Sequence, residues 1–206
     1  MSANPQEHER NRNNAEYRAF VDAAIKVFVR EGFGGTTFEH LSRATGIEKM
    51  DLSKRFGSIE SIFRLVYDDQ TAKATEPYRQ SMPEFDSAIE ATRYFAARQR
   101  EAINGTQLPN LFRIVVTEKQ RHPEIADILT TPNWQEGGQA IAEYILQTMI
   151  DRGLFNPCNV RFAAREFFGS INQALVHEPA ATGQPIADLD EYIEHICQSF
   201  ASRYSD

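Results

Sequence analysis

The stretch TTFEHLSRATGIEKMDLSKRFGS, residues 36–58, constrains the fold of this chain more than any other segment. Apolar residues recur at helical spacing from Phe38 to Ala44, Gly46 interrupts the pattern, and a second short apolar helix follows over about residues 48–56. Small residues at such a break let two helices approach closely and cross at a steep angle. The segment therefore predicts a helix-turn-helix, an arrangement that can place its second helix in the major groove of DNA.

Two polar residues mark where helices are expected to begin in this region. Thr36 is followed three residues later by Glu39, which is the capping-box pattern of a helix start. Ser58 precedes the apolar helical pattern of residues 59–73 and has the side chain of a good N-cap. We therefore expect Thr36 and Ser58 to fix the beginnings of the second and fourth helices of the chain.

Helical periodicity continues on both sides of this segment. An amphipathic pattern begins near residue 15 and ends at Gly32, and apolar residues beyond position 76 recur at helical spacing. No stretch alternates as a half-buried strand does, and residues 130–138, TTPNWQEGG, are expected to form a loop. We expect an all-α protein of nine or ten helices. Its expected parts are a flexible arm over 1–14, a helix-turn-helix domain over 15–75, and a larger helical domain over 76–206.

The charge of the chain restricts its partners. The formal net charge is −7, of which the first 70 residues carry −1 and the remainder −6. A protein that coats nucleic acid without sequence preference is basic, because its affinity comes from phosphate neutralisation. Any DNA contact here must therefore come from a local basic surface. The same acidity disfavours anionic membrane surfaces, and no apolar run is long enough to span a bilayer.

Cysteine usage and the N-terminus favour a cytoplasmic protein. Cys158 and Cys197 are the two cysteines, and they form no CxxC pair that would suggest a disulfide framework or a zinc site. The polar N-terminal residues lack the apolar segment of a secretory signal. We therefore expect a reducing cytoplasmic location.

Motifs of enzymes and metal sites are missing from the sequence. No G-x-S-x-G, HExxH, P-loop or dinucleotide-binding glycine pattern occurs, so we expect no catalytic residue and no cofactor. Glu191, Glu194 and His195 share one side of the last helix, but no third histidine lies near them. A solvated helix face is the expected role of this group, with no metal bound. An enzyme housed in the larger domain is an alternative without a supporting motif.

The short helix over residues 48–56 carries basic side chains at its outward positions. Lys49, Lys54 and Arg55 can contact phosphates or guanine edges, since cationic donors suit both. Asp51 can accept a hydrogen bond from the N4 amine of cytosine. The alternative for Asp51 is a solvated residue that opposes binding at wrong sites.

At this point the sequence resembles a known family. Residues 17–66 resemble the DNA-binding domain of the TetR family of bacterial transcription regulators, in the stretch AAIKVFVREGFGGTTFEHLSRATGI and in the later residues Leu52, Phe56, Ser58 and Glu60. Residues 108–155 resemble, more loosely, the ligand domain of the AefR-like branch. The resemblance implies a homodimeric regulator, most often a repressor. It also implies a palindromic double-stranded DNA operator and a small apolar effector.

Three departures from the family pattern concern DNA contact. Ser53 stands where the family usually has an aromatic residue on a phosphate, Ile59 stands where it has a lysine, and Met50-Asp51 replaces a Gly/Thr pair. A dimer with degenerate DNA recognition, which acts by protein or ligand binding, therefore stays an alternative. Thr37 can donate to a phosphate or serve only as a cap. The candidate DNA contacts are Thr37, Lys49, Asp51, Ser53, Lys54 and Arg55.

Two apolar helices of the larger domain are candidates for a dimer interface. The helices expected over 139–152 and 159–177 have wide apolar faces that contain small residues, which allow close helix packing. A purely internal core is the alternative explanation. The candidate interface residues are Ile145, Met149, Ala163, Phe167, Ser170 and Ala174.

Aromatic residues of the same domain are candidates for an effector pocket. Binding sites for small molecules are lined mainly by apolar and aromatic side chains, and the resemblance implies a pocket in the middle of this domain. Each of these residues can equally belong to the packed core. The candidate pocket residues are Tyr94, Phe95, Phe112, Trp134, Phe167 and Phe168.

Overall fold

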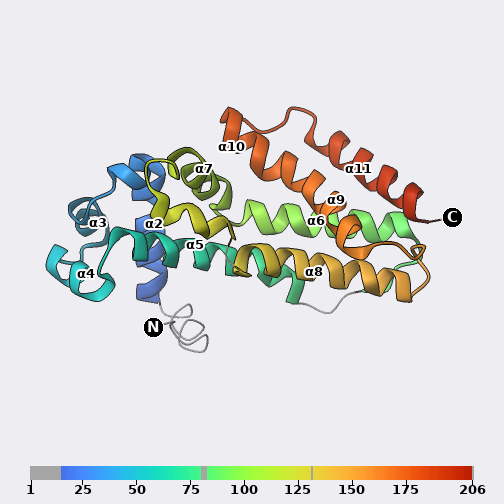
Figure 1. Cartoon of the computed structure of the whole chain (residues 1–206), viewed down its shortest axis with the longest axis horizontal. Helices are drawn as coiled ribbons and strands as arrows, with labels where there is room; N and C mark the ends of the chain where they lie inside the picture. The colour runs from blue at the N-terminus through green and yellow to red at the C-terminus, as the bar shows by residue number, and fades with distance from the viewer. Residues whose placement is uncertain (1–14, 80–82, 131, 206) are drawn as a thin grey trace. The chain divides into compact units, whose positions relative to one another are not determined.

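The structure is a computed structural model that describes residues 15–79, 83–130 and 132–205 (Figure 1). The expected arm over residues 1–14 lies outside the described residues. All regular elements of the described part are helical, which confirms the all-α prediction and the number of helices, ten, α2 to α11. The first elements are α2 (Ala15–Gly35), α3 (Phe38–Thr45), α4 (Lys49–Phe56), α5 (Ile59–Thr75) and the 3₁₀ helix η1 (Glu76–Arg79).

The remaining elements belong mainly to the second half of the chain. They are α6 (Ala88–Asn104), α7 (Leu108–Glu118), the 3₁₀ helix η2 (Pro123–Thr130), α8 (Pro132–Asp151), α9 (Val160–Asn172), the π-helix η3 (Gln173–His177), α10 (Glu178–Thr182) and α11 (Leu189–Tyr204).

The chain divides into two compact units. The first, called the head below, comprises the residues up to Gln70 together with Ile114–Ile128. The second, called the larger unit, comprises Thr71–Arg113 and Leu129–Asp206. This division differs from the expected boundary after residue 75, because a segment from the middle of the chain packs with the N-terminal helices.

An aromatic core holds the helices of the head together. The Phe20 and Phe56 rings stack with centroids 4.8 Å apart, which joins α2 to α4. The Phe28 ring meets the edge of Phe63 at 4.9 Å, which joins α2 to α5. Leu41 of α3 and Leu52 of α4 are fully buried. Such burial of large apolar side chains is the main stabilising term of a small three-helix unit.

The helix starts of the head differ from prediction at one position. Thr37, not Thr36, caps α3, since its hydroxyl oxygen accepts a hydrogen bond from the His40 backbone N–H at 3.2 Å. The Thr36 hydroxyl instead donates to the carbonyl of Gly32 at 2.6 Å. The prediction for Ser58 is confirmed, because its hydroxyl accepts from the Ser61 N–H at 3.1 Å at the start of α5.

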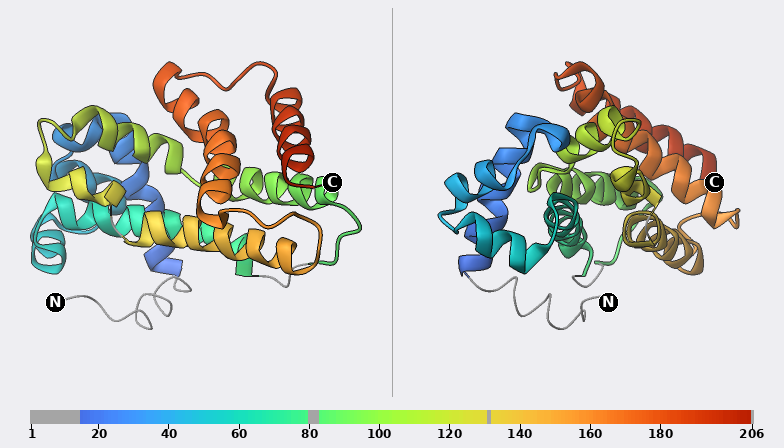
Figure 2. Two further views of the ribbon diagram at one scale, coloured as in Figure 1. Left: turned by 45° about the vertical axis from the view of Figure 1, so that its right-hand side comes forward. Right: turned by 60° about the vertical axis from the view of Figure 1, so that its left-hand side comes forward.

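Two helix pairs dominate the larger unit. Helix α11 packs against α6, and α8 packs against α9, and the left view of Figure 2 shows that the helices of each pair cross (Figures 1 and 2). The loop expected over residues 130–138 is wrong from Pro132 onward, because α8 begins there. Proline suits the first turn of a helix, and two glycines inside a helix cost only about 1 kcal/mol each. No helix in the described part of the chain is long and apolar enough to cross a membrane.

Candidate functional site

Helix α4 presents most of its side chains to solvent from a buried apolar base. Leu52 is fully buried and Phe56 is half-buried against Phe20, so these residues fix the orientation of the helix. Gly46, with φ of 74°, makes the left-handed turn between α3 and α4 that a residue with a side chain rarely adopts. The predicted helix-turn-helix geometry therefore follows from one glycine and a small apolar contact.

All six candidate DNA contacts are exposed, and they lie on α4 or at the start of α3. Thr37 caps α3, so its hydroxyl accepts one hydrogen bond and still has a proton to donate. The guanidinium of Arg55 lies over the Phe56 ring, 5.2 Å from its centroid. This cation–π contact orients Arg55 along the helix. The structure thus brings together a local set of exposed donors on an otherwise acidic chain.

One exposed residue of this helix, Met50, is not among the predicted DNA contacts. Met50 has 62% of its surface exposed, in the first turn of α4. Its neighbours Lys49 and Asp51 are also exposed. The signal in the sequence was a large apolar residue at an outward position, where the family usually has a glycine.

The family position normally taken by a lysine falls at the start of α5. Ile59 is the first residue of that helix and is half-buried. Glu60 follows it, and its carboxylate accepts a hydrogen bond from Arg64 at 2.8 Å. Residue 59 therefore provides no cationic contact at this helix start.

The end of α7 is joined to the end of α2 inside the head. The Glu118 carboxylate accepts hydrogen bonds from the backbone N–H of Phe33 at 3.0 Å and of Gly34 at 2.7 Å. These N–H groups follow Gly32, whose φ of 72° breaks the helix. A Cβ added at Gly32 would lie 2.5 Å from Oε1 of Glu118. Glycine at position 32 is therefore required by both the backbone angle and the close approach of the carboxylate.

A second set of contacts joins the same segment to α5. Arg64 donates to the carboxylate of Asp127 at 2.6 Å and to the carbonyl of Glu124. The His122 ring meets the edge of the Phe33 ring at 5.0 Å. These contacts explain why residues 114–128 belong to the head.

The predicted pocket aromatics of the larger unit form separate packed clusters. The rings of Tyr94 and Phe95 contact each other and Phe85, and the rings of Phe167 and Phe168 contact each other at 5.4 Å. Phe112 is elsewhere, and its ring stacks on His177 at 5.1 Å. The side chain of Trp134 lies outside the described residues, although α8 includes this position.

A row of polar side chains runs beside these aromatics. The Tyr78 hydroxyl donates to the Gln99 side-chain carbonyl, and the Gln99 amide donates to Oδ1 of Asn172 at 2.6 Å. All three are half-buried, and the Tyr78 ring meets the edge of Phe168 at 6.4 Å. Asn172 directly precedes η3, and π-helical turns are frequent at functional sites. This polar row, Tyr78–Gln99–Asn172, can select a polar group within an apolar surrounding.

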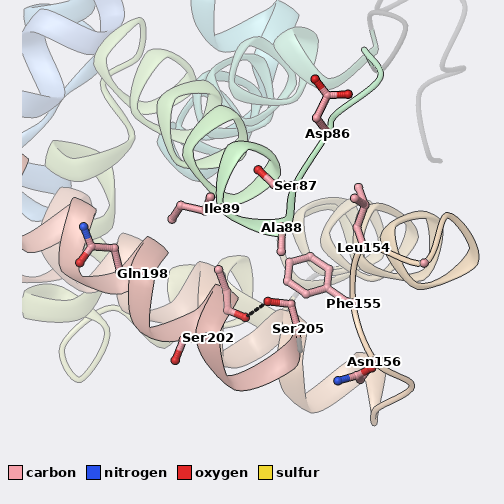
Figure 3. A pocket seen from close by; sticks show the side chains of 12 residues that line it. Asp86, Ser87, Ala88, Ile89, Leu154, Phe155, Asn156, Gln198, Ser202 and Ser205 are labelled. Atoms are coloured by element: carbon pink, nitrogen blue, oxygen red, sulfur yellow. Dashed lines mark hydrogen bonds between the residues drawn. The ribbon is translucent and has the colours of Figure 1, made fainter.

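The clefts in the described part of the larger unit include two that involve α11. The first has a volume of about 520 Å³ and is lined by the start of α6, the turn after α8 and the end of α11 (Figure 3). Its lining includes Ser87, Phe155 and Ser202. The second, of about 400 Å³, lies between α6 and α11. None of the predicted aromatic residues whose side chains the structure describes lines either cleft.

The candidate dimer residues lie largely inside the protomer. Five of them are buried, because α8 and α9 pack their apolar faces within one chain. Ser170 is half-buried, and its hydroxyl donates to the carbonyl of Glu166. The buried five are Ile145, Met149, Ala163, Phe167 and Ala174. Burial of these five residues within one chain accords with an internal core, and their place in a dimer interface stays a prediction.

Other residues of α8 and α9 carry exposed apolar surface. Tyr144 is 69% exposed and Phe162 is 67% exposed. Gly169 lies two turns after Phe162 on α9, and a Cβ placed there meets nothing within 4 Å. The surface available to a partner therefore includes the side of α9 that carries Phe162 and Gly169.

Glu194, one of the three residues weighed as a metal site, forms an ion pair with Arg93. Both oxygens of the Glu194 carboxylate accept hydrogen bonds from Arg93, and Gln198 donates to one of them. These bonds, with Arg93 first, lower the pKa of Glu194 to about 2. No cluster of potential metal ligands occurs within the described ranges. Glu194 thus pairs α11 with α6.

Comparison with known families gives two matches that cover different parts of the chain. Residues 20–66 match the family described as bacterial regulatory proteins of the tetR family. Residues 90–206 match the C-terminal domain of AefR-like transcriptional repressors. Comparison with curated protein sequences gave no match.

Solved structures share the fold across most of the chain. A TetR transcriptional regulator from Agrobacterium tumefaciens has a TM-score of 0.70 at 18% identity, over 93% of this chain and 95% of that one. FadR from Bacillus subtilis, solved with stearoyl-CoA, has a TM-score of 0.66 at 19% identity, over 90% and 98%. GusR from Salmonella enterica has a TM-score of 0.65 at 15% identity, over 97% and 98%. At such identities the similarity concerns the fold.

Proposed function

Because the chain belongs to the TetR family and is a DNA-binding transcription regulator, we propose that it acts as a dimeric repressor. In this proposal an apolar effector bound to the larger unit releases the protein from a palindromic operator. The observation that carries the proposal is α4, a helix with exposed donors on a buried apolar base. Two copies related by two-fold symmetry would enter adjacent major grooves.

A gel-shift titration with the DNA upstream of the gene, repeated over a range of salt concentrations, tests operator binding. We expect a sequence-selective shift whose salt dependence is shallow, because Ile59 and Ser53 replace phosphate-contacting residues. Ile59→Lys should steepen the slope of log K against log salt by about 1.8 per dimer, as each added phosphate contact contributes about 0.9. Gln120→Lys, at an exposed position outside α4 and α5, is the matched control. A protein without selective binding at low salt would favour the degenerate-recognition alternative.

We place the dimer contact on the exposed side of α9. Phe162 provides apolar surface, and the open position at Gly169 lets a partner helix approach. Phe162→Glu should convert the dimer to a monomer in analytical ultracentrifugation, whereas Tyr144→Glu, an equally exposed site on α8, should not. A dimer that survives Phe162→Glu and dissociates with Tyr144→Glu would move the contact to α8.

We place the effector among the aromatic side chains next to the polar row. FadR, which shares the fold, was solved with stearoyl-CoA, and a fatty acyl chain suits the apolar rings of Phe95 and Phe168. The polar row would bind the polar end of the acyl chain. Thermal shift measurements with fatty acids and acyl-CoA thioesters of increasing chain length test this class. Bound ligand raises the apparent stability in proportion to the logarithm of its concentration.

Blocking variants distinguish this location from the cleft of Figure 3. Gln99→Leu should weaken effector binding if the polar row is used. Ala88→Trp, which adds an indole to a cleft residue, should leave binding unchanged. The opposite pattern would assign the effector to the cleft.

Helix α7 is the element that we propose to link the effector to DNA. Its first residues belong to the larger unit, where the Phe112 ring stacks on His177, and its last residues belong to the head. There Glu118 binds two backbone N–H groups at the end of α2. An effector at the polar row would contact Asn172, which directly precedes the π-helix that carries His177. It would thereby shift the Phe112–His177 stack and, through α7, the end of α2. Because such linkage is reciprocal, operator DNA should weaken effector affinity by the factor by which effector weakens DNA affinity.

A further inference from the structure

Met50 is the one large apolar residue exposed to more than half of its surface in the described part of the head. It lies in the first turn of α4, two residues before the buried Leu52. In a helix with 3.6 residues per turn, two positions correspond to about 200°. Met50 and Lys54, each two residues from Leu52, therefore lie on the side of α4 opposite its buried face.

The surroundings of Met50 are polar. Lys49, Asp51, Ser53 and Lys54 are all exposed. A single apolar side chain among charged neighbours is too small a surface for a stable protein contact, which needs roughly 800 Å² from each partner. Met50 has the size and the position to contact one apolar group of a base pair in the groove that α4 is proposed to enter.

The major groove contains one such group. Thymine carries a 5-methyl group there, and apolar side chains contact it, while residues at the N-terminal end of a reading helix reach base edges. Methionine is long, unbranched and polarisable, so its thioether can fill an irregular apolar gap beside a base. Asp51, next in sequence, opposes the acceptor groups O6 and N7 of guanine, since a carboxylate cannot donate to them.

We propose that Met50 determines operator specificity by contacting the 5-methyl group of a thymine in each half-site. The proposal rests on the proposed function, because it requires α4 to enter the major groove. Lys54, on the same side of the helix, would contact a neighbouring guanine edge or phosphate. The family's usual glycine at this position would make no such contact, so the contact is a property of this chain.

The first experiment selects binding sequences from a random duplex pool with the full-length protein at low salt. We expect a palindromic consensus with a thymine at one fixed position of each half-site. The same selection with Met50→Gly should keep the palindrome and lose the preference at that position. An absence of any enriched sequence would refute both DNA recognition and this inference. A consensus unchanged by Met50→Gly would refute the inference alone.

The second experiment removes only the methyl group. Deoxyuridine replaces the selected thymine in both half-sites, and affinity is measured by fluorescence anisotropy for the wild type and for Met50→Ala. The wild type should lose about fourfold per half-site, the value for one buried methyl group, and about 15-fold for both. Met50→Ala should bind the two duplexes equally well.

A control variant tests whether the lost response to deoxyuridine is specific to α4. Val116→Ala truncates another exposed apolar residue of the head, on α7, and should retain the full loss on deoxyuridine. Circular dichroism checks that Met50→Ala is folded, as expected for an exposed position. Equal losses for the wild type and Met50→Ala on deoxyuridine would overturn the proposal, because the methyl group would then act on the DNA itself.

Discussion

The interiors of the two units differ in chemistry. The head encloses aromatic rings that meet edge-on at Phe63 and stack between Phe20 and Phe56, together with fully buried Leu41 and Leu52. The larger unit encloses aromatic clusters too, but half-buried amides and a phenol form a hydrogen-bonded row beside them. The head also buries polar side chains, since the Gln70 amide donates to the Asp69 carboxylate at 3.0 Å, but the contacts beneath α4 are apolar. Amides between helices, as in the row of the larger unit, can exchange partners. The comparison indicates that apolar packing holds α4 in a fixed position in the head. The polar row of the larger unit can instead rearrange around a bound molecule.

The largest expected effect tests the rigidity of the head. Leu52→Ala should lower the free energy of unfolding by about 3 kcal/mol, because it removes a fully buried side chain and leaves a cavity. Denaturant titration measures the loss, and Met50→Ala on the same helix should leave stability unchanged. A loss below about 1 kcal/mol would mean that α4 is only loosely held, and the contrast between the interiors would weaken.

A smaller effect is expected at the contact between Glu118 of α7 and the end of α2 inside the head. Glu118→Ala should cost about 2 kcal/mol, since hydrogen bonds to a charged group contribute about 1.5–3 kcal/mol. It should also reduce the release of operator DNA by effector while leaving effector affinity nearly unchanged. Anisotropy titrations with and without effector measure this release, and Lys119→Ala at the next, exposed position is the control. Full release by effector in Glu118→Ala would remove α7 from the linkage.

The polar row provides the third test. Gln99→Leu should cost about 1 kcal/mol, because Tyr78 and Asn172 each lose a hydrogen-bond partner in a half-buried place. Tyr78→Phe added to Gln99→Leu should cost little more, because the phenol has already lost its acceptor. Additive losses in this double-mutant cycle would mean that the row is not a connected network.

The smallest effect concerns an exposed ion pair between α6 and α11. The pKa of Glu194 is lowered to about 2 by its hydrogen bonds to Arg93 and then Gln198, so the folded state favours the ionised carboxylate. The stability from this pair is present above the ordinary pKa, near 4.5, and is lost as the pH falls toward 2. Denaturant midpoints of the wild type and Glu194→Gln should therefore differ at pH 7 and converge below pH 3. The difference should be small, because the pair is exposed, and a constant difference across pH would assign it to packing.

The head was more predictable from sequence than the larger unit, and its residues explain why. Helix spacing around Gly46, Leu52 and Ser58 determines local structure, so the short helices and one cap followed from neighbours in sequence. The Thr36 cap was wrong by one residue, because the Thr36 hydroxyl bonds backward to Gly32. Ala44, the last apolar residue of the helical pattern that starts at Phe38, is exposed, whereas Leu41 is fully buried.

Partners distant in sequence were the least predictable feature. Apolar spacing indicated Met149 and Phe167 as candidates for a dimer interface and did not reveal that α8 and α9 pack on each other within the chain. The bonds of Glu118 to Phe33 and Gly34 span more than 80 residues and involve backbone N–H groups, which leave no mark in composition. The helical spacing from Leu52 places Met50 at an outward position, and the structure adds that 62% of its surface is exposed.

The packing of residues 114–128 against the N-terminal helices has a consequence for engineering. A biosensor made by grafting a foreign effector module onto this head would normally be spliced once, near residue 75. Such a splice discards Glu118, which binds the end of α2, and Asp127, which pairs with Arg64 of α5. A graft that retains 114–128 with the first 70 residues keeps the DNA-reading module whole. The positions at which this regulator can be divided into modules therefore lie within helices such as α5 and α7, not in its loops.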